Sequence, residues 1–497
     1  MADAGKVESQ KGLFGTPKGF PTVFITELCE RFSYYGMKAI LLYYIIGAVG
    51  GANHGLGLER QTGITIVALY GALIYLSTIL GGWLSDRVFG QTRMITVGGF
   101  FIMCGHIVLA LPFGIGGMFV SLALLIIGTG LLKPNVSALV GRLYDSPQYE
   151  NKRDAGFSIF YMGVNLGAVI ATILVGTIGQ KVNYHIGFSI AAIVMAIGLF
   201  VFIVFFGRRF SYLDTGAPNP LRSNEKRRVG IIAGIIVLVI LITVGIVMYD
   251  PQFGEHFAKT LVLAVTIALV FFCFINMLSS KEITPQERKN VTIYIPLFLA
   301  GVLLWIIQES GGNILAEFVM RANNQIGGFV ISESWYQSIN PIIVISGCSF
   351  FAFLWTKLGP RQPSIVAKLC IGLALLSVSY LMLVPIAKMG TGFSPFFVVL
   401  SYVLTASGEV FISPLLLSVT TLLAPRKYTS QLMAVWYLSN AVAQSINAQT
   451  AGWYISHPMS YFSVIGILPC IFLFVLLLMR KKIIAQIDLS RPALKIN

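Results

Sequence analysis

The stretch VGIIAGIIVLVILITVGIVM, residues 229–248, decides the fold class of this sequence. It runs for twenty residues without a charged side chain. An α-helix rises about 1.5 Å per residue, so twenty residues cover about 30 Å, which is the thickness of the hydrocarbon core of a bilayer. A second charge-free run follows at residues 260–278. Both runs predict plain membrane-spanning helices whose side chains face lipid.

The composition of the whole chain agrees with a membrane protein. Of 497 residues, 56% are hydrophobic and 11% are charged, and the mean hydropathy is +0.81. One soluble core does not hide that much apolar surface, so the lipid bilayer is the expected partner. The net charge of +15 comes from basic residues between apolar runs, whereas a nucleic-acid surface needs them clustered on one face. No nucleic-acid partner is expected.

Further apolar segments give an all-α membrane protein with fourteen transmembrane helices. Six begin before the two central runs and six after them, near Pro21, Thr62, Met94, Gly117, Ala155, Tyr184, Val291, Trp335, Pro363, Phe393, Gln431 and Tyr461. We therefore expect two six-helix bundles, at residues 21–208 and 291–482. Residues 209–290 hold cytoplasmic linkers and the two extra helices, and residues 1–20 and 483–497 are tails.

The distribution of Lys and Arg predicts the orientation. Cytoplasmic loops near helix ends carry an excess of positive charge. Of the 35 Lys and Arg residues, one side of the predicted map has only Arg60, Lys181, Lys259, Arg321 and Lys388. Almost all the others lie on the side of the two termini, which places both termini in the cytoplasm.

Seven ionisable residues lie well inside predicted spans, where charge is expensive and marks functional candidates: Glu27, Glu30, Arg31, Lys38, Lys133, Glu309 and Glu409. With Tyr34, the members on the first helix fall within a sector of roughly 100°. The simpler interpretation is a structural Glu27–Arg31 ion pair that fixes helix packing. This interpretation does not explain why charges recur in the first and fourth helices of both halves.

This recurrence predicts a transport mechanism. Two six-helix halves that meet at a midplane site are what alternating access requires. We predict two salt-bridge gates between the halves, Lys38 with Glu309 and Lys133 with Glu409. Four acids face three bases, so the site lacks one positive charge until a proton or a cationic group enters. Proton coupling is therefore expected, at the first-helix charges and Glu309.

Polar and aromatic residues complete the candidate cavity. They offer an apolar body with a polar tip, and they are Tyr34, Tyr35, Tyr75, Asn165, Asn340, Trp436 and Tyr437. Pro134, beside Lys133, and Pro414, after Glu409, predict helix breaks that free backbone groups to line a wet cavity. The six cysteines show no Cys-x-x-Cys pair, and no metal or organic cofactor is expected. No P-loop, G-x-S-x-G or H-E-x-x-H motif supports the alternative of a membrane-embedded enzyme.

The segment ELCERFSYYG, residues 27–36, resembles the E-x-x-E-R-F-x-Y-Y-G signature of the proton-dependent oligopeptide transporters, a family of the major facilitator superfamily. GTGLLKPN at 128–135 and FYMGVNLG at 160–167 resemble the family's fourth- and fifth-helix motifs, and residues 81–93 resemble the superfamily's loop between helices two and three. The resemblance covers essentially the whole chain, including the two extra helices. It implies a major facilitator fold and a monomeric symporter that imports di- and tripeptides across the bacterial cytoplasmic membrane.

The resemblance also implies roles for single residues. Glu27, Glu30 and Arg31 would couple protons. Arg31 and Lys133 would bind the peptide carboxylate and Glu409 its amino terminus. Asn165 and Asn340 would add hydrogen bonds. The other expected substrate contacts come from the cavity residues themselves, which are Tyr34, Tyr35, Lys38, Tyr75 and Trp436.

The chain departs from the family pattern at two positions. Lys38 stands where Arg is expected, and Ser310 stands where Gln commonly follows the helix-seven Glu. Lys does not make the bidentate fork of Arg, so a Lys38–Glu309 gate is expected to be weaker than usual. A related proton-coupled carrier of another anion or zwitterion, such as nitrate or an amino acid, is the alternative within the transporter class.

Overall fold

The computed structural model describes residues 16–50, 53–145, 149, 152–207, 216–217 and 219–490. Parts of the expected tails and of the central linker lie outside these residues. So do six of the basic residues used to predict the orientation: Lys6, Lys11, Arg208, Arg209, Arg491 and Lys495.

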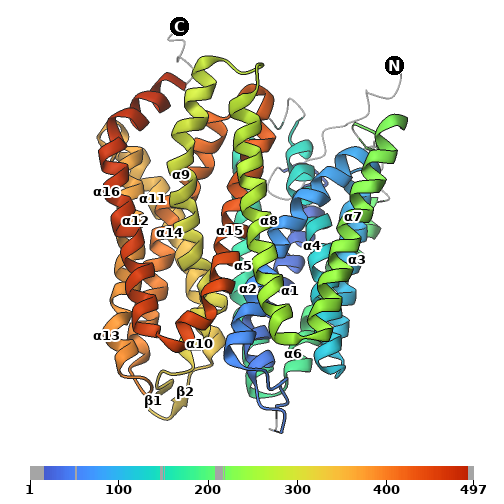
Figure 1. Ribbon diagram of the computed structural model, residues 1–497, viewed down its shortest axis with the longest axis vertical. Coiled ribbons are helices and arrows are strands. Elements are labelled where there is room, and N and C mark those ends of the chain that lie inside the picture. Colours follow the sequence, from blue (N-terminus) through green and yellow to red (C-terminus); the bar gives the residue numbers. More distant parts are fainter. Residues whose placement is uncertain are drawn as a thin grey trace. The chain divides into compact units, whose positions relative to one another are not determined.

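Helices make up most of the described chain (Figure 1). The first eight are α1 Phe20–Ile46, α2 Arg60–Leu84, α3 Gln91–Ala110, α4 Gly114–Leu143, α5 Arg153–Lys181, α6 Tyr184–Val201, α7 Ser223–Tyr249 and α8 Pro251–Ser279. The others are α9 Pro285–Glu309, α10 Ile314–Val319, α11 Ile339–Leu358, α12 Ile365–Leu381, α13 Leu383–Lys388, α14 Pro395–Leu423, α15 Thr429–Ser456 and α16 Pro458–Ser490. Between α10 and α11, strands β1 Gln325–Ile326 and β2 Phe329–Val330 pair antiparallel.

Local sequence explains where several of these helices begin. Asp250 and Ser394 cap α8 and α14 with their side chains, and each is followed by a proline at the first helical position. Thr284 and Glu287 form a reciprocal capping box at the start of α9. A capping side chain pairs an otherwise unsatisfied backbone N–H group, and proline has no N–H to satisfy.

In the described part of the chain, twelve helical segments are long and apolar enough to cross a membrane. Helices α1 and α15, with 27 and 28 residues, have the necessary length but more polar sequences. The all-α membrane fold is thus confirmed, and the expected fourteen spans agree approximately with these helices.

The chain divides into two compact units. The first comprises residues Met1–Ile40 and Ser77–Ile235, and its described core is built around α3, α4 and α6. Close backbone approach between α3 and α4 depends on two glycines: a side-chain carbon at Gly98 would lie 2.7 Å from the Gly128 carbonyl oxygen. A larger residue at either position would separate these helices.

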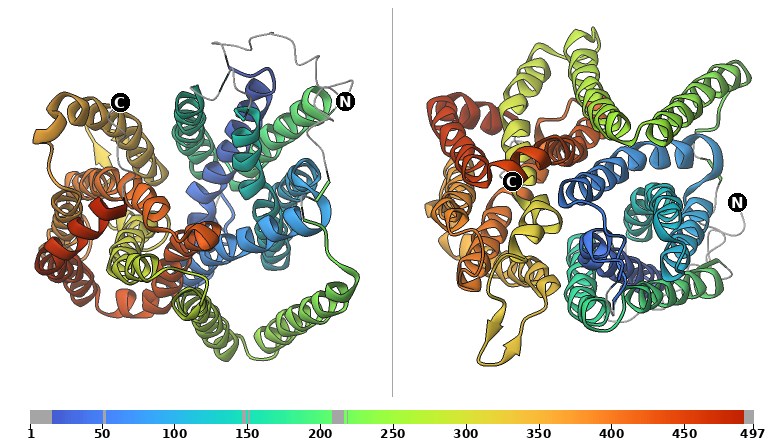
Figure 2. Two further views of the ribbon diagram at one scale, coloured as in Figure 1. Left: turned by 90° about the horizontal axis from the view of Figure 1, so that it is seen from above. Right: turned by 60° about the horizontal axis from the view of Figure 1, so that its bottom comes forward.

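The second unit comprises Leu41–Leu76 and Ile236–Asn497. Its helices α9, α11, α12, α14, α15 and α16 pack into a bundle, which Figure 2 shows end on. The β1–β2 hairpin projects from this bundle (Figure 2). The unit also includes the end of α1 and most of α2, so α2 contributes residues to both units.

Helices α7 and α8 differ in their surroundings. On α7, the side chains of Ile231, Leu238 and Leu241 are each more than half exposed, as expected for a plain lipid-facing helix. The same expectation was only half right for α8. One of its faces, with Phe274 and Met277, is buried against α9 and α15, because an apolar stripe at helical spacing packs on neighbouring helices.

Candidate functional site

The first-helix motif forms a buried ionic cluster in the first unit. Arg31 Nε lies 3.2 Å from Glu27 Oε1 and also contacts Glu30 Oε2. All three residues are buried, each at most 5% exposed. Glu27 Oε2, Glu30 Oε1 and Arg31 Nη2 are buried without a hydrogen-bond partner among the described residues. Buried polar atoms are normally paired, so the cluster retains capacity for a proton or a polar ligand group.

Tyr34 extends this cluster along α1. The Arg31 guanidinium carbon lies 5.2 Å from the centre of the Tyr34 ring, and Lys38 Nζ lies 5.9 Å from it. The Tyr35 ring packs edge-on against the Tyr34 ring at 5.1 Å. Aromatic faces attract cations, so the motif places two positive side chains on one ring.

Helix α5 approaches α1 through glycine. A side-chain carbon at Gly167 would lie 2.9 Å from the Leu28 carbonyl oxygen, and one at Gly163 would collide with the Phe24 ring. These glycines explain the FYMGVNLG pattern. Asn165, between them, is 8% exposed and donates to the Tyr161 carbonyl oxygen at 3.0 Å.

Lys133 lies on α4, in the same unit as the α1 cluster, and its positive charge acts on Glu27. Helix α4 continues through Pro134 rather than breaking there, which corrects the expected break. The following Asn135 donates its side-chain amide to the Leu131 carbonyl oxygen at 2.6 Å. The amide thus satisfies one carbonyl beside the position where proline removes a backbone donor.

In the second unit, Glu309 ends α9. A short 3-10 turn, Ser310–Gly312, separates it from α10. The Glu309 carboxylate accepts hydrogen bonds from Asn440 Nδ2 and Gln444 Nε2, both at 2.8 Å. We call these two residues the amide cradle. Gln444 Oε1 also accepts from Asn313 at 3.4 Å, which ties the turn to α15.

Glu409 lies in the middle of α14 and is 9% exposed. It accepts a hydrogen bond of 2.7 Å from Asn340 Nδ2, so the structure brings together two residues that the sequence placed in one cavity. The charges of Glu309 and Glu409 repel one another within this unit. Helix α14 also continues through its proline, Pro414.

The aromatic candidates have different environments. Trp436 is 4% exposed, and its ring centre lies 6.0 Å from that of Trp305. Gly301 leaves room for it, since a side-chain carbon there would lie 2.9 Å from the Trp436 ring. Tyr75 is partly buried. Tyr437 is 45% exposed, so it is a poor candidate for a closed pocket.

The two predicted gate pairs each join residues of different units. Lys38 and Lys133 belong to the first unit, and Glu309 and Glu409 belong to the second. Both salt bridges therefore stay predictions.

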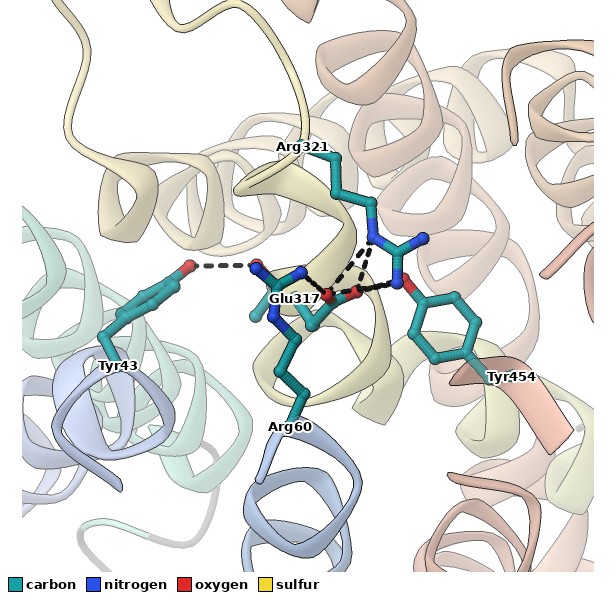
Figure 3. Close-up of polar contacts among 6 residues, drawn as sticks. Tyr43, Arg60, Glu317, Arg321 and Tyr454 are labelled. Carbon is teal, nitrogen blue, oxygen red and sulfur yellow. Dashed lines mark hydrogen bonds and ion pairs between the residues drawn. The ribbon is translucent and has the colours of Figure 1, made fainter. Parts of the chain in front are cut away.

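Sequence reasoning missed a second ionic cluster, which Figure 3 shows. Glu317 on α10 is completely buried and pairs with Arg60 and Arg321. Both arginines were predicted to lie in connections between spans, and Glu317 was not predicted to lie within a span. One signal was available: Glu317 and Arg321 have the i,i+4 spacing of a helical ion pair.

The amide cradle was missed as well. Asn440, Gln444 and Asn447 repeat at i, i+4 and i+7, which puts three amides on one face of α15. Asn447 Nδ2 donates to the Ile306 carbonyl oxygen at 3.0 Å, one turn before the end of α9. A polar stripe of this kind in an apolar helix was visible in the sequence.

Many membrane-spanning helices with buried acids and bases in both parts of the chain define a multi-spanning membrane transporter. The comparison with known families is more specific. Residues 92–467 match the PTR2 profile of the POT family, and the chain belongs to this family. The family members described below are transporters, so the chain is a transporter and not an enzyme.

Several relatives are similar over nearly their full length. The uncharacterized transporter YclF of Bacillus subtilis is 44% identical over 95% of both chains. A di-/tripeptide transporter of Lactococcus lactis is 41% identical over 96% of this chain and 98% of its own length. Among solved structures, peptide transporter POT in complex with sulfate has a TM-score of 0.90 at 43% identity, covering 96% of this chain and 97% of that one.

A further solved structure is a POT family transporter in complex with 5-aminolevulinic acid. It has a TM-score of 0.89 at 39% identity and covers 95% of this chain and 98% of that one. These matches confirm the family, the fold class and the bacterial membrane transporter class that the sequence predicts.

Proposed function

We propose that the chain is a proton-coupled symporter that imports di- and tripeptides. The observation that carries the proposal is the buried Glu27–Glu30–Arg31 cluster, which keeps unpartnered polar atoms in a span. A zwitterionic peptide needs a cation for its carboxylate and an acid for its amino group. Arg31 and Lys133 offer the first, and Glu409, oriented by Asn340, offers the second. Relatives named as di-/tripeptide transporters support this substrate class.

Protons are the coupling ion in this proposal, and no other cofactor takes part. Glu27, Glu30 and Glu309 are the acids that exchange them. Glu27 and Glu30 both contact Arg31, and Glu309 accepts hydrogen bonds from two neutral amides. Each acid therefore keeps a polar partner inside the protein when its charge changes. Substrate contacts beyond these are assigned to Tyr34, Tyr35, Tyr75, Asn165 and Trp436.

The transport cycle that we propose is alternating access between the bundles at residues 21–208 and 291–482. The Lys38–Glu309 and Lys133–Glu409 pairs close the two ends in turn. Peptide and proton binding break them, because a carboxylate that is protonated or bound to an amino group no longer holds its lysine. The chain acts as a monomer in the cytoplasmic membrane, with both termini in the cytoplasm.

Uptake into proteoliposomes tests the function. A labelled dipeptide and tripeptide should accumulate when the vesicle interior is alkaline, and a protonophore should abolish accumulation. Glu409→Gln should reduce accumulation strongly, whereas Asp145→Asn is the matched control because Asp145 is 60% exposed in a surface ion pair. Competition by free amino acids or nitrate, with no competition by peptides, would overturn the peptide assignment in favour of another anion or zwitterion.

A further inference from the structure

The connection between α2 and α3 offers a backbone acceptor to another segment of the chain. It begins with a π-helical turn, Ser85–Phe89, a form that is rare and often found at functional sites. The Gly90 N–H donates to the Ser85 carbonyl oxygen at 2.9 Å, so the carbonyl oxygen of Asp86 is available to a partner outside the turn. That partner is the backbone N–H of Asn219, at 2.9 Å, in the linker that leads into α7.

Three further contacts attach the start of α7 to this connection. The Leu221 N–H donates to the Arg87 carbonyl oxygen at 3.1 Å. Arg87 Nη2 also lies 2.6 Å from Glu225 Oε2, in the first turn of α7. A side-chain carbon at Gly90 would lie 2.7 Å from the Gly216 carbonyl oxygen, so the two backbones touch there as well. All of these residues belong to the first unit, and the stretch at 81–93 thereby gains a role in holding α7.

Beyond this attachment, α7 has little contact with protein. None of its side chains that the structure describes is buried, and Tyr249 at its end is 93% exposed. Asp250 alone joins α7 to α8, and a side-chain carbon at Gly254 would lie 2.4 Å from Val247 Cα, so the two helices meet closely at this turn. Helix α7 is thus held at its ends. A helix whose sides face lipid can tilt at modest cost.

Helix α8 is held by the second unit near both of its ends. Close to its start, Glu255 accepts a hydrogen bond of 3.0 Å from Thr62 on α2. Close to its end, Phe274 is buried and Asn276 donates to Gln431 on α15 at 3.2 Å. These five residues all belong to the second unit, whereas α7 begins in the first. The α7–α8 hairpin therefore starts in one unit and finishes in the other.

We propose that the α7–α8 hairpin is a strap that joins the α2–α3 connection to the second unit. Helix α8 is its fixed arm, and α7 is the arm that tilts in the lipid when the two units move past one another. Because each arm is attached to a different unit, the strap limits how far that movement goes. This inference rests on the alternating access proposed above.

Distances between pairs of spin labels test the strap in the reconstituted full-length protein. The six native cysteines are replaced first, and peptide uptake is checked. New cysteines then replace four exposed residues: Val182 after α5 and Lys226 on α7 in the first unit, and Ser279 on α8 and Met389 after α13 in the second. Each pair is measured at neutral pH without peptide and at acidic pH with a dipeptide.

The Val182–Met389 pair reports the movement of the two units. The strap predicts that the Lys226–Ser279 distance shifts under the same conditions, while the Val182–Lys226 and Ser279–Met389 distances stay constant. If the Lys226–Ser279 distance stays constant while the Val182–Met389 distance shifts, the hairpin travels as one body and the strap is overturned. A shift of the Val182–Lys226 distance would also overturn it, because α7 would not be attached to the first unit.

Loss of the Arg87–Glu225 pair tests the attachment without any need for transport. Glu225→Gln should broaden the Val182–Lys226 distance distribution in the resting protein and leave that of Ser279–Met389 unchanged. Arg87→Gln should do the same, and the double variant should add nothing further, since both substitutions remove one ion pair. Asp145→Asn, in an exposed pair elsewhere in the first unit, is the matched control. A distribution as narrow in both variants as in the control would refute the attachment and with it the strap.

Peptide uptake is measured on the same variants. Glu225→Gln and Arg87→Gln should each lower the uptake rate by up to about fivefold, the factor that corresponds to one partly exposed ion pair. Absent uptake together with broadened resting distributions refutes the proposed function and supports the strap. Normal uptake together with a constant Lys226–Ser279 distance refutes the strap alone.

Discussion

The α1 cluster and the Glu309 site bury carboxylates in two different ways. On α1, Glu27 and Glu30 are both in contact with the guanidinium of Arg31, so the two carboxylates share one cation. At the end of α9, the Glu309 carboxylate is bound by the neutral amides of Asn440 and Gln444. Arg31 supplies a full positive charge to the first site, and two oriented amide dipoles contribute to the second.

The difference has a mechanistic consequence. Removing a cation leaves a buried charge uncompensated, whereas removing one amide leaves a second amide in place. The α1 cluster is thus sensitive to any change of charge, including the arrival of a peptide carboxylate at Arg31. Glu309 can exchange its proton or its lysine partner while the amide cradle keeps its side chain in position.

The largest effect is expected when the shared cation is removed. Arg31→Gln should lower the free energy of unfolding by about 3–5 kcal/mol and reduce peptide uptake by about 100-fold or more. Thermal unfolding in detergent and uptake into proteoliposomes measure these two quantities. Arg31→Lys should restore part of both, since it keeps the charge without the planar fork.

The next effect concerns the acid held by amides. Glu309→Gln keeps the size and polarity of the side chain but removes its charge and its proton. We expect uptake driven by a pH gradient to fall by about tenfold or more, the factor for one charged hydrogen-bonded group. Peptide exchange without a gradient should persist. If both modes fell equally, Glu309 would be a binding residue rather than a coupling residue.

A smaller effect is expected from the amide cradle itself. Gln444→Leu removes one donor to Glu309 and the acceptor for Asn313, so stability should fall by about 1–3 kcal/mol and uptake several-fold. Gln449→Leu is the matched control on the same helix, where the amide donates to Thr260 at the surface. Equal effects of the two substitutions would show that the cradle has no special role.

The smallest effect is expected at the position that departs from the family pattern. Lys38→Arg should strengthen the predicted pair with Glu309 through a second hydrogen bond and slow uptake by about threefold or less. The effect should disappear in the Glu309→Gln background. If the effect persists in that background, Lys38 acts through its contact with the Tyr34 ring and not through a gate with Glu309.

The sequence predicted the fold class and the local ionic cluster of α1 because both depend on near neighbours. Twenty apolar residues determine a span, and the spacing of Glu27, Glu30 and Arg31 puts them on one face of one helix. For Asn340 and Glu409, the sequence predicted only that both residues line one cavity, and not that they form a hydrogen bond. Its two residues are 69 positions apart, so helix packing and not sequence spacing brings them together.

The Glu317 cluster and the amide cradle each left a local signal in the sequence, but their long-range partners were not predictable for a related reason. Arg60 is 257 residues from Glu317, and no periodicity connects them. Arg60 and Arg321 lie outside the apolar runs, so the predicted map placed them in connections. That one buried acid pairs with both becomes visible only when the helix ends are packed. The proline breaks were wrong because α4 and α14 continue as helices past a proline.

The turn at Ser310–Gly312 means that α9 and α10 do not transmit force as a single rigid rod. Glu309 ends one arm and Glu317 lies on the other, while Asn313 and Gln444 join the turn to α15 by one long hydrogen bond. In the transport cycle that we propose, a carrier with this turn straightened would couple the position of Glu309 rigidly to that of Glu317. We expect such a carrier to leak protons without peptide and so to dissipate the gradient on which uptake would depend.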